Sequence, residues 1–148
     1  MLISSERFGE FEVEEATILT FKFGIPGFDD TKEYILLPSD VSNNIFWLQS
    51  LKQPNLSMCL IDIETVMPQY SPEIPKFVFN ELKMQSLVDI KCFAIINVQN
   101  DISTMTANLA APLVINTSNN LAKQVILEES PYYTKYPVYQ YIEEYATV

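Results

Sequence analysis

Short apolar runs separated by turn residues dominate the chain, and most of them predict β-strands. Phe11 and Val13 alternate with glutamates, a pattern typical of a strand with one face in water. Leu19, Phe21 and Phe23 alternate with polar residues in the same way. Further strands are predicted at 34–37, 45–48, 58–63, 92–98, 105–109, 113–116 and 121–127. The runs at 58–63 and 92–98 are apolar almost throughout, as expected of central strands that are buried on both faces.

One helix is predicted between Pro75 and Leu87, where Val78 and its apolar neighbours follow helical spacing. Pro75 suits the first turn because its missing N–H needs no partner there. The polar residues 117–120 predict a hairpin loop. Eight or nine short strands with regular turn signals indicate a mainly β fold, a small antiparallel β-barrel-like or sandwich domain with one short helix. Because no linker or repeat divides the chain, we expect a single domain over residues 1–148.

The composition is that of an ordinary globular chain, with 48% hydrophobic residues. No apolar run approaches the roughly 18 residues that span a bilayer. The start, Met1–Arg7, lacks the basic and apolar regions of a signal peptide. We therefore expect a cytoplasmic protein. Cys59 and Cys92 each lie in an apolar run, which predicts buried free thiols in that reducing compartment.

The charge excludes more than it identifies. There are 19 acidic and 9 basic residues, a formal net charge of -10 and an isoelectric point near 4.3. Such a chain repels nucleic acid and anionic membranes, which bind proteins through lysine and arginine. It would speed encounter with a basic partner. Taken alone, the acidic composition is explained better by the solubility of a cytosolic protein than by a basic partner.

Most catalytic chemistry is missing from the sequence. The chain has no histidine, which removes the usual general base and the commonest metal ligand. Two isolated cysteines and three glycines build neither a zinc site nor a phosphate-binding loop. The pair Asp29–Asp30 is more typical of a helix cap or a solvated loop than of a metal site. We therefore expect no enzyme and no cofactor, with an enzyme based on carboxylates alone as a distant alternative.

The segment Gly24–Phe28 predicts a type II turn, because Pro26 presets the second position and Gly27 supplies the positive φ of the third. The simpler interpretation is that this turn ends a strand and anchors Phe28 in the core. The alternative is a fixed loop that presents Ile25 or Phe28 to a partner.

The strand Phe46–Ser50 carries bulky side chains on both faces, so one face needs a cover from the protein itself or from a partner. Trp47 is the only tryptophan, and tryptophan is enriched both in cores and in binding hot spots. A core role is favoured for Trp47. Phe46, Trp47 and Gln49 are nevertheless candidate partner-binding residues.

Two further features admit a structural and a binding interpretation. Asn108 and Asn116 lie among apolar residues, where their amides must be hydrogen-bonded; a role in turns is favoured over contact with a partner. Tyrosines gather with glutamates late in the chain, which suits either a packed tail or an interface for an amphipathic, partly basic segment. These tyrosines are Tyr132, Tyr133, Tyr136, Tyr139, Tyr141 and Tyr145.

Several blocks together resemble the FliW family of flagellar assembly factors. The most specific are Gly24–Phe28, Trp47–Ser50 and Asn108–Pro112. The shared pattern begins at the strand 10–13 and ends at Tyr132, in order over nearly the whole chain.

The resemblance implies a compact β-barrel-like protein that binds newly made flagellin and, as an alternative partner, the RNA-binding translational repressor CsrA. Sequestration of the repressor would relieve repression of flagellin translation. We expect a terminal helical segment of flagellin to bind an apolar groove near Trp47. The acidic residues expected to steer the repressor are Glu14, Glu15, Glu64 and Glu73. A monomer is expected, and the alternative function is a β-barrel that binds a small apolar ligand.

Overall fold

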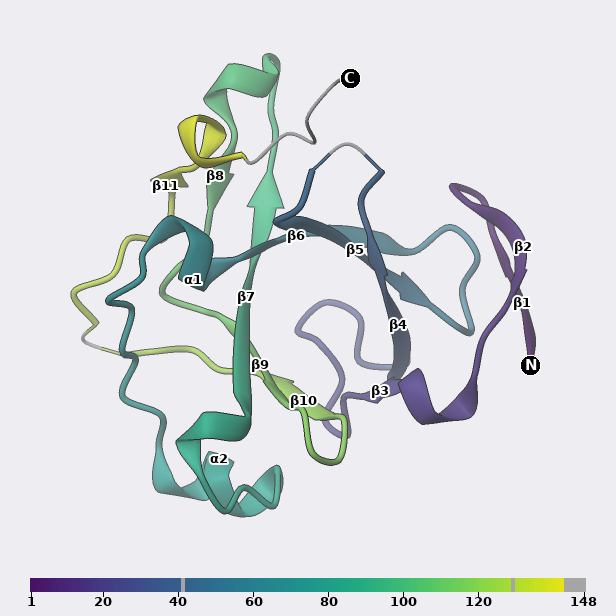
Figure 1. Ribbon diagram of the computed structural model, residues 1–148, viewed down its shortest axis with the longest axis horizontal. Coiled ribbons are helices and arrows are strands. Elements are labelled where there is room, and N and C mark those ends of the chain that lie inside the picture. Colours follow the sequence, from purple (N-terminus) through teal and green to yellow (C-terminus); the bar gives the residue numbers. More distant parts are fainter. Residues whose placement is uncertain (41, 129, 143–148) are drawn as a thin grey trace.

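A closed β-barrel forms the centre of the molecule, in a computed structural model that describes residues 1–40, 42–128 and 130–142 (Figure 1). Its strands are β3 (Leu19–Thr20), β4 (Glu33–Pro38), β5 (Ile45–Ser50), β6 (Ser57–Asp62), β7 (Ile90–Asn97), β9 (Leu113–Asn116) and β10 (Leu121–Gln124). They pair in the order β7-β6-β5-β4-β3-β10-β9, and β9 pairs back onto β7 to close the barrel. All of these pairs are antiparallel except β3 with β10. The predicted mainly β, barrel-like fold is confirmed.

The remaining elements lie around this barrel. The strands β1 (Leu2–Ser5) and β2 (Gly9–Glu12) form a separate hairpin at one side, while β8 (Thr106–Ala107) and β11 (Tyr136–Pro137) extend the sheet beyond β7 (Figure 1). The helices are α1 (Ile63–Val66) and α2 (Lys76–Glu81). Single 3-10 turns lie at η1 (Glu15–Thr17), η2 (Leu87–Asp89), η3 (Ile102–Thr104) and η4 (Tyr139–Tyr141).

Side chains fill the interior of the barrel. Alternate residues of each strand point inward, so that one cluster joins all seven strands. Phe21 and Tyr34 meet edge to face with ring centroids 5.3 Å apart, and Phe46 meets Phe93 in the same way. The buried members are Leu19, Phe21, Ile25, Tyr34, Leu48, Met58, Leu60, Phe93, Leu113, Ile115 and Ala122.

Three covers bury the outer face of the barrel. Ile3 of the β1–β2 hairpin and Val13, which follows β2, pack on Ile35. The helix α2 packs on β9 and on the chain that follows β10. The helix α1 and the C-terminal segment cover the outer side of β5, β6 and β7. Because β6 and β7 are packed on both faces, their sequences are nearly continuous apolar runs.

The helices differ from the expected single helix at 75–87. The helix α2 begins after Pro75 as predicted but ends at Glu81, because the backbone of Lys83 enters the left-handed region with φ of 52°. A second short helix, α1, follows β6 directly. Asp62 starts it by accepting a hydrogen bond from the Glu64 N–H at 3.2 Å, an N-cap that the apolar run had concealed.

Three strands are shorter than predicted. The predicted strand at 19–23 stops at Thr20, and the Gly24 N–H then donates to the Phe21 carbonyl to form a turn. The strand predicted at 121–127 stops at Gln124, because its next partner, Pro112, has no N–H to donate. The strand predicted at 105–109 is reduced to β8. The 117–120 hairpin loop between β9 and β10 is confirmed.

Among the residues that the structure describes, no helix has the length and apolar character needed to cross a bilayer.

Candidate protein-binding groove

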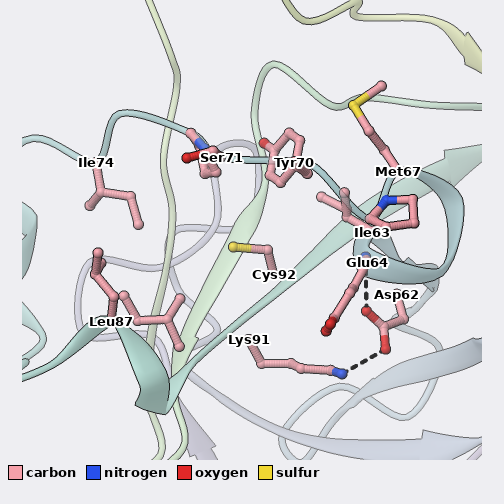
Figure 2. A pocket seen from close by; sticks show the side chains of 13 residues that line it. Asp62, Ile63, Glu64, Met67, Tyr70, Ser71, Ile74, Leu87, Lys91 and Cys92 are labelled. Carbon is pink, nitrogen blue, oxygen red and sulfur yellow. Dashed lines mark hydrogen bonds and ion pairs between the residues drawn. The ribbon is translucent and has the colours of Figure 1, made fainter.

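A groove lined by both apolar and polar side chains lies beside β7 and is made of two adjoining hollows. The first hollow, of about 300 Å³, lies between the chain that leaves α1, the η2 turn and the outer side of β7. Its lining comes from 62–64, 67–68, 70–72, 74, 87 and 90–92. Figure 2 shows Cys92 in the middle of this hollow, with Ile74 and Leu87 at one end and charged residues at the other.

The second hollow, of about 640 Å³, continues the first, since Ser71 and Ile74 line both. Its walls are the segment 71–77, which includes the start of α2, and residues 126–128 and 130–132, which follow β10. Phe77 and Ile126 both line it, and these residues are 57% and 64% exposed. We call the two hollows together the groove.

Acidic residues dominate the charged lining of the groove. Asp62 and Glu64 line the first hollow, and Glu73 and Glu128 line the second. Among the described residues, Lys91 is the one basic residue in either lining, and its Nζ is 2.7 Å from Oδ2 of Asp62. The pair Asp62–Lys91 is therefore neutral as a unit, and the exposed carboxylates of the other three residues give the groove a negative rim.

Two tyrosines hold the wall of the groove in place. The Tyr70 hydroxyl donates to the Leu109 carbonyl at 2.7 Å, and its ring contacts that of Tyr132 with centroids 4.5 Å apart. The Tyr132 hydroxyl in turn accepts the Ser71 N–H at 2.9 Å. Burial, with smaller contributions from Cys92 and Tyr132, raises the pKa of Tyr70, so its hydroxyl stays protonated and remains a donor.

The Lys123 side chain lies between one ring that lines the groove, Phe77, and one that does not, Phe23. The Lys123 ammonium lies 4.6 Å from the ring centroid of Phe23 and 5.2 Å from that of Phe77. It also forms an ion pair with Glu81 at 2.6 Å. Phe23 is more than half exposed and lines neither hollow, so Lys123 links the Phe77 ring of the second hollow to a further exposed ring.

Burial raises the pKa of both thiols, which makes them poor nucleophiles and poor ligands at neutral pH. The pKa of Cys92 rises to about 12 through burial first and the Asp62 carboxylate second. That of Cys59 rises to about 11 through burial, which the Arg7 charge partly opposes. Both are free, as predicted, and both are only partly buried. In the described part of the chain, no three cysteine, aspartate or glutamate side chains lie close enough together to hold a metal ion.

The structure separates the predicted partner-binding residues of the Gly-Ile-Pro-Gly-Phe turn. The turn itself is as predicted: Gly27 has φ of 92°, and the Phe28 N–H donates to the Ile25 carbonyl at 2.7 Å. The expected core position of Phe28 is wrong, because Phe28 is 41% exposed. Ile25 is the buried residue of the turn, with 1% exposed. The shape of the turn points Ile25 into the barrel, and such burial argues against contact between Ile25 and a partner. Phe28 stays a candidate.

The residues predicted around Trp47 have a cover from the protein itself. The Arg7 guanidinium lies 4.0 Å from the Trp47 ring centroid, and the Phe8 ring meets it edge-on at 6.1 Å. Phe46 points inward and packs on the barrel core. Gln49 is fully buried, where Oε1 accepts a hydrogen bond from the Ser5 hydroxyl at 2.8 Å. This burial argues against direct contact between Gln49 and a partner.

The two asparagines stabilise turns. The side-chain oxygen Oδ1 of Asn108 accepts the Ala110 N–H at 3.0 Å. The Asn116 amide donates to the Leu82 carbonyl at 2.9 Å, which satisfies one of the free carbonyls at the end of α2. Asn108 is half-buried and keeps its place as a candidate for partner contact.

The four predicted acidic residues divide into two groups, all of them exposed. Glu64 and Glu73 lie on the rim of the groove. Glu14 and Glu15 lie at η1, after the β1–β2 hairpin. The sequence does not identify Phe77 and Ile126 as site residues. The one available signal is that each is apolar at a position outside the apolar pattern of its predicted helix or strand. Tyr145 and the glutamates 129, 143 and 144 lie outside the described residues.

Comparison with known proteins gives consistent results. A profile of the family described as FliW protein matches residues 2–138. A flagellar assembly factor FliW from Lachnoclostridium phytofermentans is 42% identical, with 95% of this chain and 92% of that protein covered. One from Alkaliphilus metalliredigens is 36% identical over 97% of this chain and 90% of its own. A crystal structure of the flagellar assembly factor FliW is 33% identical and superposes with a TM-score of 0.83, covering 93% of this chain and 96% of that one.

Proposed function

The chain belongs to the FliW family of flagellar assembly factors, and on that premise we propose that it binds newly made flagellin and, alternatively, the translational repressor CsrA. While flagellin is abundant in the cytoplasm, it occupies the protein and the repressor stays free to silence flagellin messenger. Once flagellin is exported, the free protein sequesters the repressor and translation resumes. The protein acts as a single-domain monomer, by holding protein partners and without direct contact to nucleic acid or membrane.

The observation that carries this proposal is the groove, an open surface that exposes the apolar residues Leu87, Phe77 and Ile126 and has an acidic rim. Exposed apolar residues that gather in one region are typical of protein-binding sites. The rim carries Glu64, Glu73 and Glu128. A negative rim beside an apolar floor favours protein segments that combine apolar with basic residues.

The decisive experiment is a calorimetric titration of the purified protein with flagellin from the same organism, repeated with the repressor already bound. Binding of flagellin that displaces the repressor is the expected result. If folded protein produced no heat with either partner, the proposed function would be wrong. If both partners bound at once, the partner exchange would be wrong while flagellin binding stood.

Electrostatic steering of the repressor gives a second test. We expect the association rate to fall steeply as salt rises from about 50 mM to 500 mM, because screening shortens the reach of the acidic residues. Charge reversal at Glu64 and Glu73 should slow association more than reversal at Glu14 and Glu15 if the repressor approaches the groove. If the association rate of the repressor did not change with salt, electrostatic steering would not contribute to binding.

The alternative function, a barrel that binds a small apolar ligand, has less support. The barrel interior is occupied by large side chains such as Phe21, Tyr34 and Leu60, each fully buried. Mass spectrometry of the purified protein tests this alternative directly, since a stoichiometric bound ligand would favour it.

A further inference from the structure

Three exposed apolar side chains are distributed along the whole length of the groove. Leu87 borders the first hollow, while Phe77 and Ile126 border the second. Each is more than half exposed, and the half-buried Ile74 lies where the hollows meet. A single occupant could therefore bury all four side chains at once, and two connected hollows of about 300 and 640 Å³ have room for several anchoring side chains.

The walls of the groove suit a helix better than an added strand. A strand binds by exchanging backbone hydrogen bonds with a free sheet edge. Pro68, Pro72 and Pro75 interrupt one wall and Pro131 interrupts the other, and proline has no N–H to donate. Recognition in this groove must therefore rest mainly on side chains, as when a helix places its apolar face in a groove with anchors at positions i, i+3 or i+4, and i+7.

The negative charge of the rim indicates which side chains lie beside the apolar face of that helix. Glu64, Glu73 and Glu128 are exposed, whereas Lys91 is already paired with Asp62. Lysine or arginine side chains beside the apolar face would find carboxylates along both hollows, and acidic side chains there would be repelled.

We propose that the groove binds one amphipathic helical segment of a partner, with apolar side chains in both hollows and basic side chains against Glu64, Glu73 and Glu128. The inference rests on the proposed function, in which flagellin supplies this segment. It places the flagellin site in the groove and not at Trp47.

The test uses full-length flagellin as the probe and exposed residues as the targets. Ile126→Ser and Phe77→Ser should each weaken flagellin binding at least tenfold in calorimetry, because each removes an apolar wall of the second hollow. Ile102→Ser is the matched control: Ile102 is 58% exposed at η3 and lines neither hollow, so flagellin should bind this variant as it binds the wild type. Urea unfolding of all three variants checks that they fold.

A charge test uses Glu73→Lys together with Glu128→Lys, with Glu15→Lys as the control. The double reversal should slow flagellin association at least several-fold at low salt, and the control should do so less. Amide hydrogen exchange should slow at 70–77 and 126–128 when flagellin binds, and not within the β1–β2 hairpin.

The outcomes separate this inference from the proposed function. If wild-type protein binds flagellin and both Ile126→Ser and Phe77→Ser bind it equally well, the groove is not the flagellin site, although the function stands. The same holds if these variants lose only the repressor. If the wild type does not bind flagellin, both the function and the inference fail. Loss of both partners would support the inference and place the repressor in the same groove.

Discussion

Two apolar regions on the outside of the barrel differ in what covers them. Trp47, on β5, is covered by the tip of the β1–β2 hairpin, where Arg7 lies over its ring and Phe8 meets its edge. The hairpin is held there by the Ser5–Gln49 hydrogen bond. At the groove, no described segment lies over Phe77 or Ile126, which stay more than half exposed. An apolar side chain covered by its own chain contributes to folding, and one left open can contribute to binding.

The largest effect is expected for Trp47→Ala, which tests whether Trp47 contributes to folding and not to binding. Removing a large, partly buried ring should lower the free energy of unfolding by about 2–4 kcal/mol, measured by urea denaturation. Flagellin affinity of the folded protein should change less than about threefold, since about 0.6 kcal/mol corresponds to that factor. Ile126→Ser is the converse control: its stability should change by no more than about 0.5 kcal/mol. A stable Trp47→Ala variant that fails to bind flagellin would reverse the roles of the two regions.

The second largest effect is expected at Asp62, at the charged end of the groove. Asp62→Ala removes both the cap of α1 and the partner of Lys91, and should lower the free energy of unfolding by about 1–2 kcal/mol. Most of this comes from the cap, because the Lys91 side chain is 38% exposed and water screens the ion pair. Asp62→Asn can still accept the Glu64 N–H and should lose less than half as much. Equal losses in the two variants would show that the ion pair dominates.

A smaller effect on the free energy of unfolding is expected when Arg7, which covers the Trp47 ring, is replaced. Arg7→Ala removes a cation over the ring and should lower the free energy of unfolding by about 0.5–1 kcal/mol. Because Trp47 is the only tryptophan, its fluorescence reports this contact directly, and emission should shift to longer wavelength as the ring meets water. Arg7→Lys keeps the charge without the planar group and should give an intermediate shift. Unchanged emission in Arg7→Ala would mean that the hairpin does not shield the ring.

The barrel could be predicted from the sequence because its periodicity is local. The nearly continuous apolar runs of β6 and β7 follow directly from burial of both faces. Outside the barrel, the alternation of Phe11 and Val13 with glutamates follows from burial of one face. The end of α2 could not be predicted, because it depends on Lys83 adopting positive φ. The cover of Trp47 could not be predicted either, since the hairpin that supplies it is about 40 residues away in sequence.

Only part of the groove can be predicted from the sequence, because its residues are also far apart in the chain. Glu64 and Glu73 were expected to contact a partner, and both lie on its rim, but their charge said nothing about the apolar floor. That floor combines segments from α1, η2, β7 and the chain after β10, which only the closed barrel brings together. The sequence predicts a helix at Phe77 and a strand at Ile126, and neither prediction indicates that the side chain is left uncovered.

The two cysteines allow the two regions to be compared in one sample, with the smallest perturbation. Cys59 is the β6 neighbour of Trp47, and Cys92 lines the groove. Burial raises their pKa values from 9.0 to about 11 and about 12, so both should react slowly with a thiol reagent at pH 8 and much faster in urea. Since both values are higher in the folded protein, the stability that burial of the neutral thiols provides should be complete below pH 9 and decrease as pH rises towards 12. Flagellin should slow the labelling of Cys92 further and leave that of Cys59 unchanged, with Cys59→Ser and Cys92→Ser used to assign each rate. Protection of Cys59 alone would place the partner at Trp47, and protection of Cys92 alone would place it in the groove.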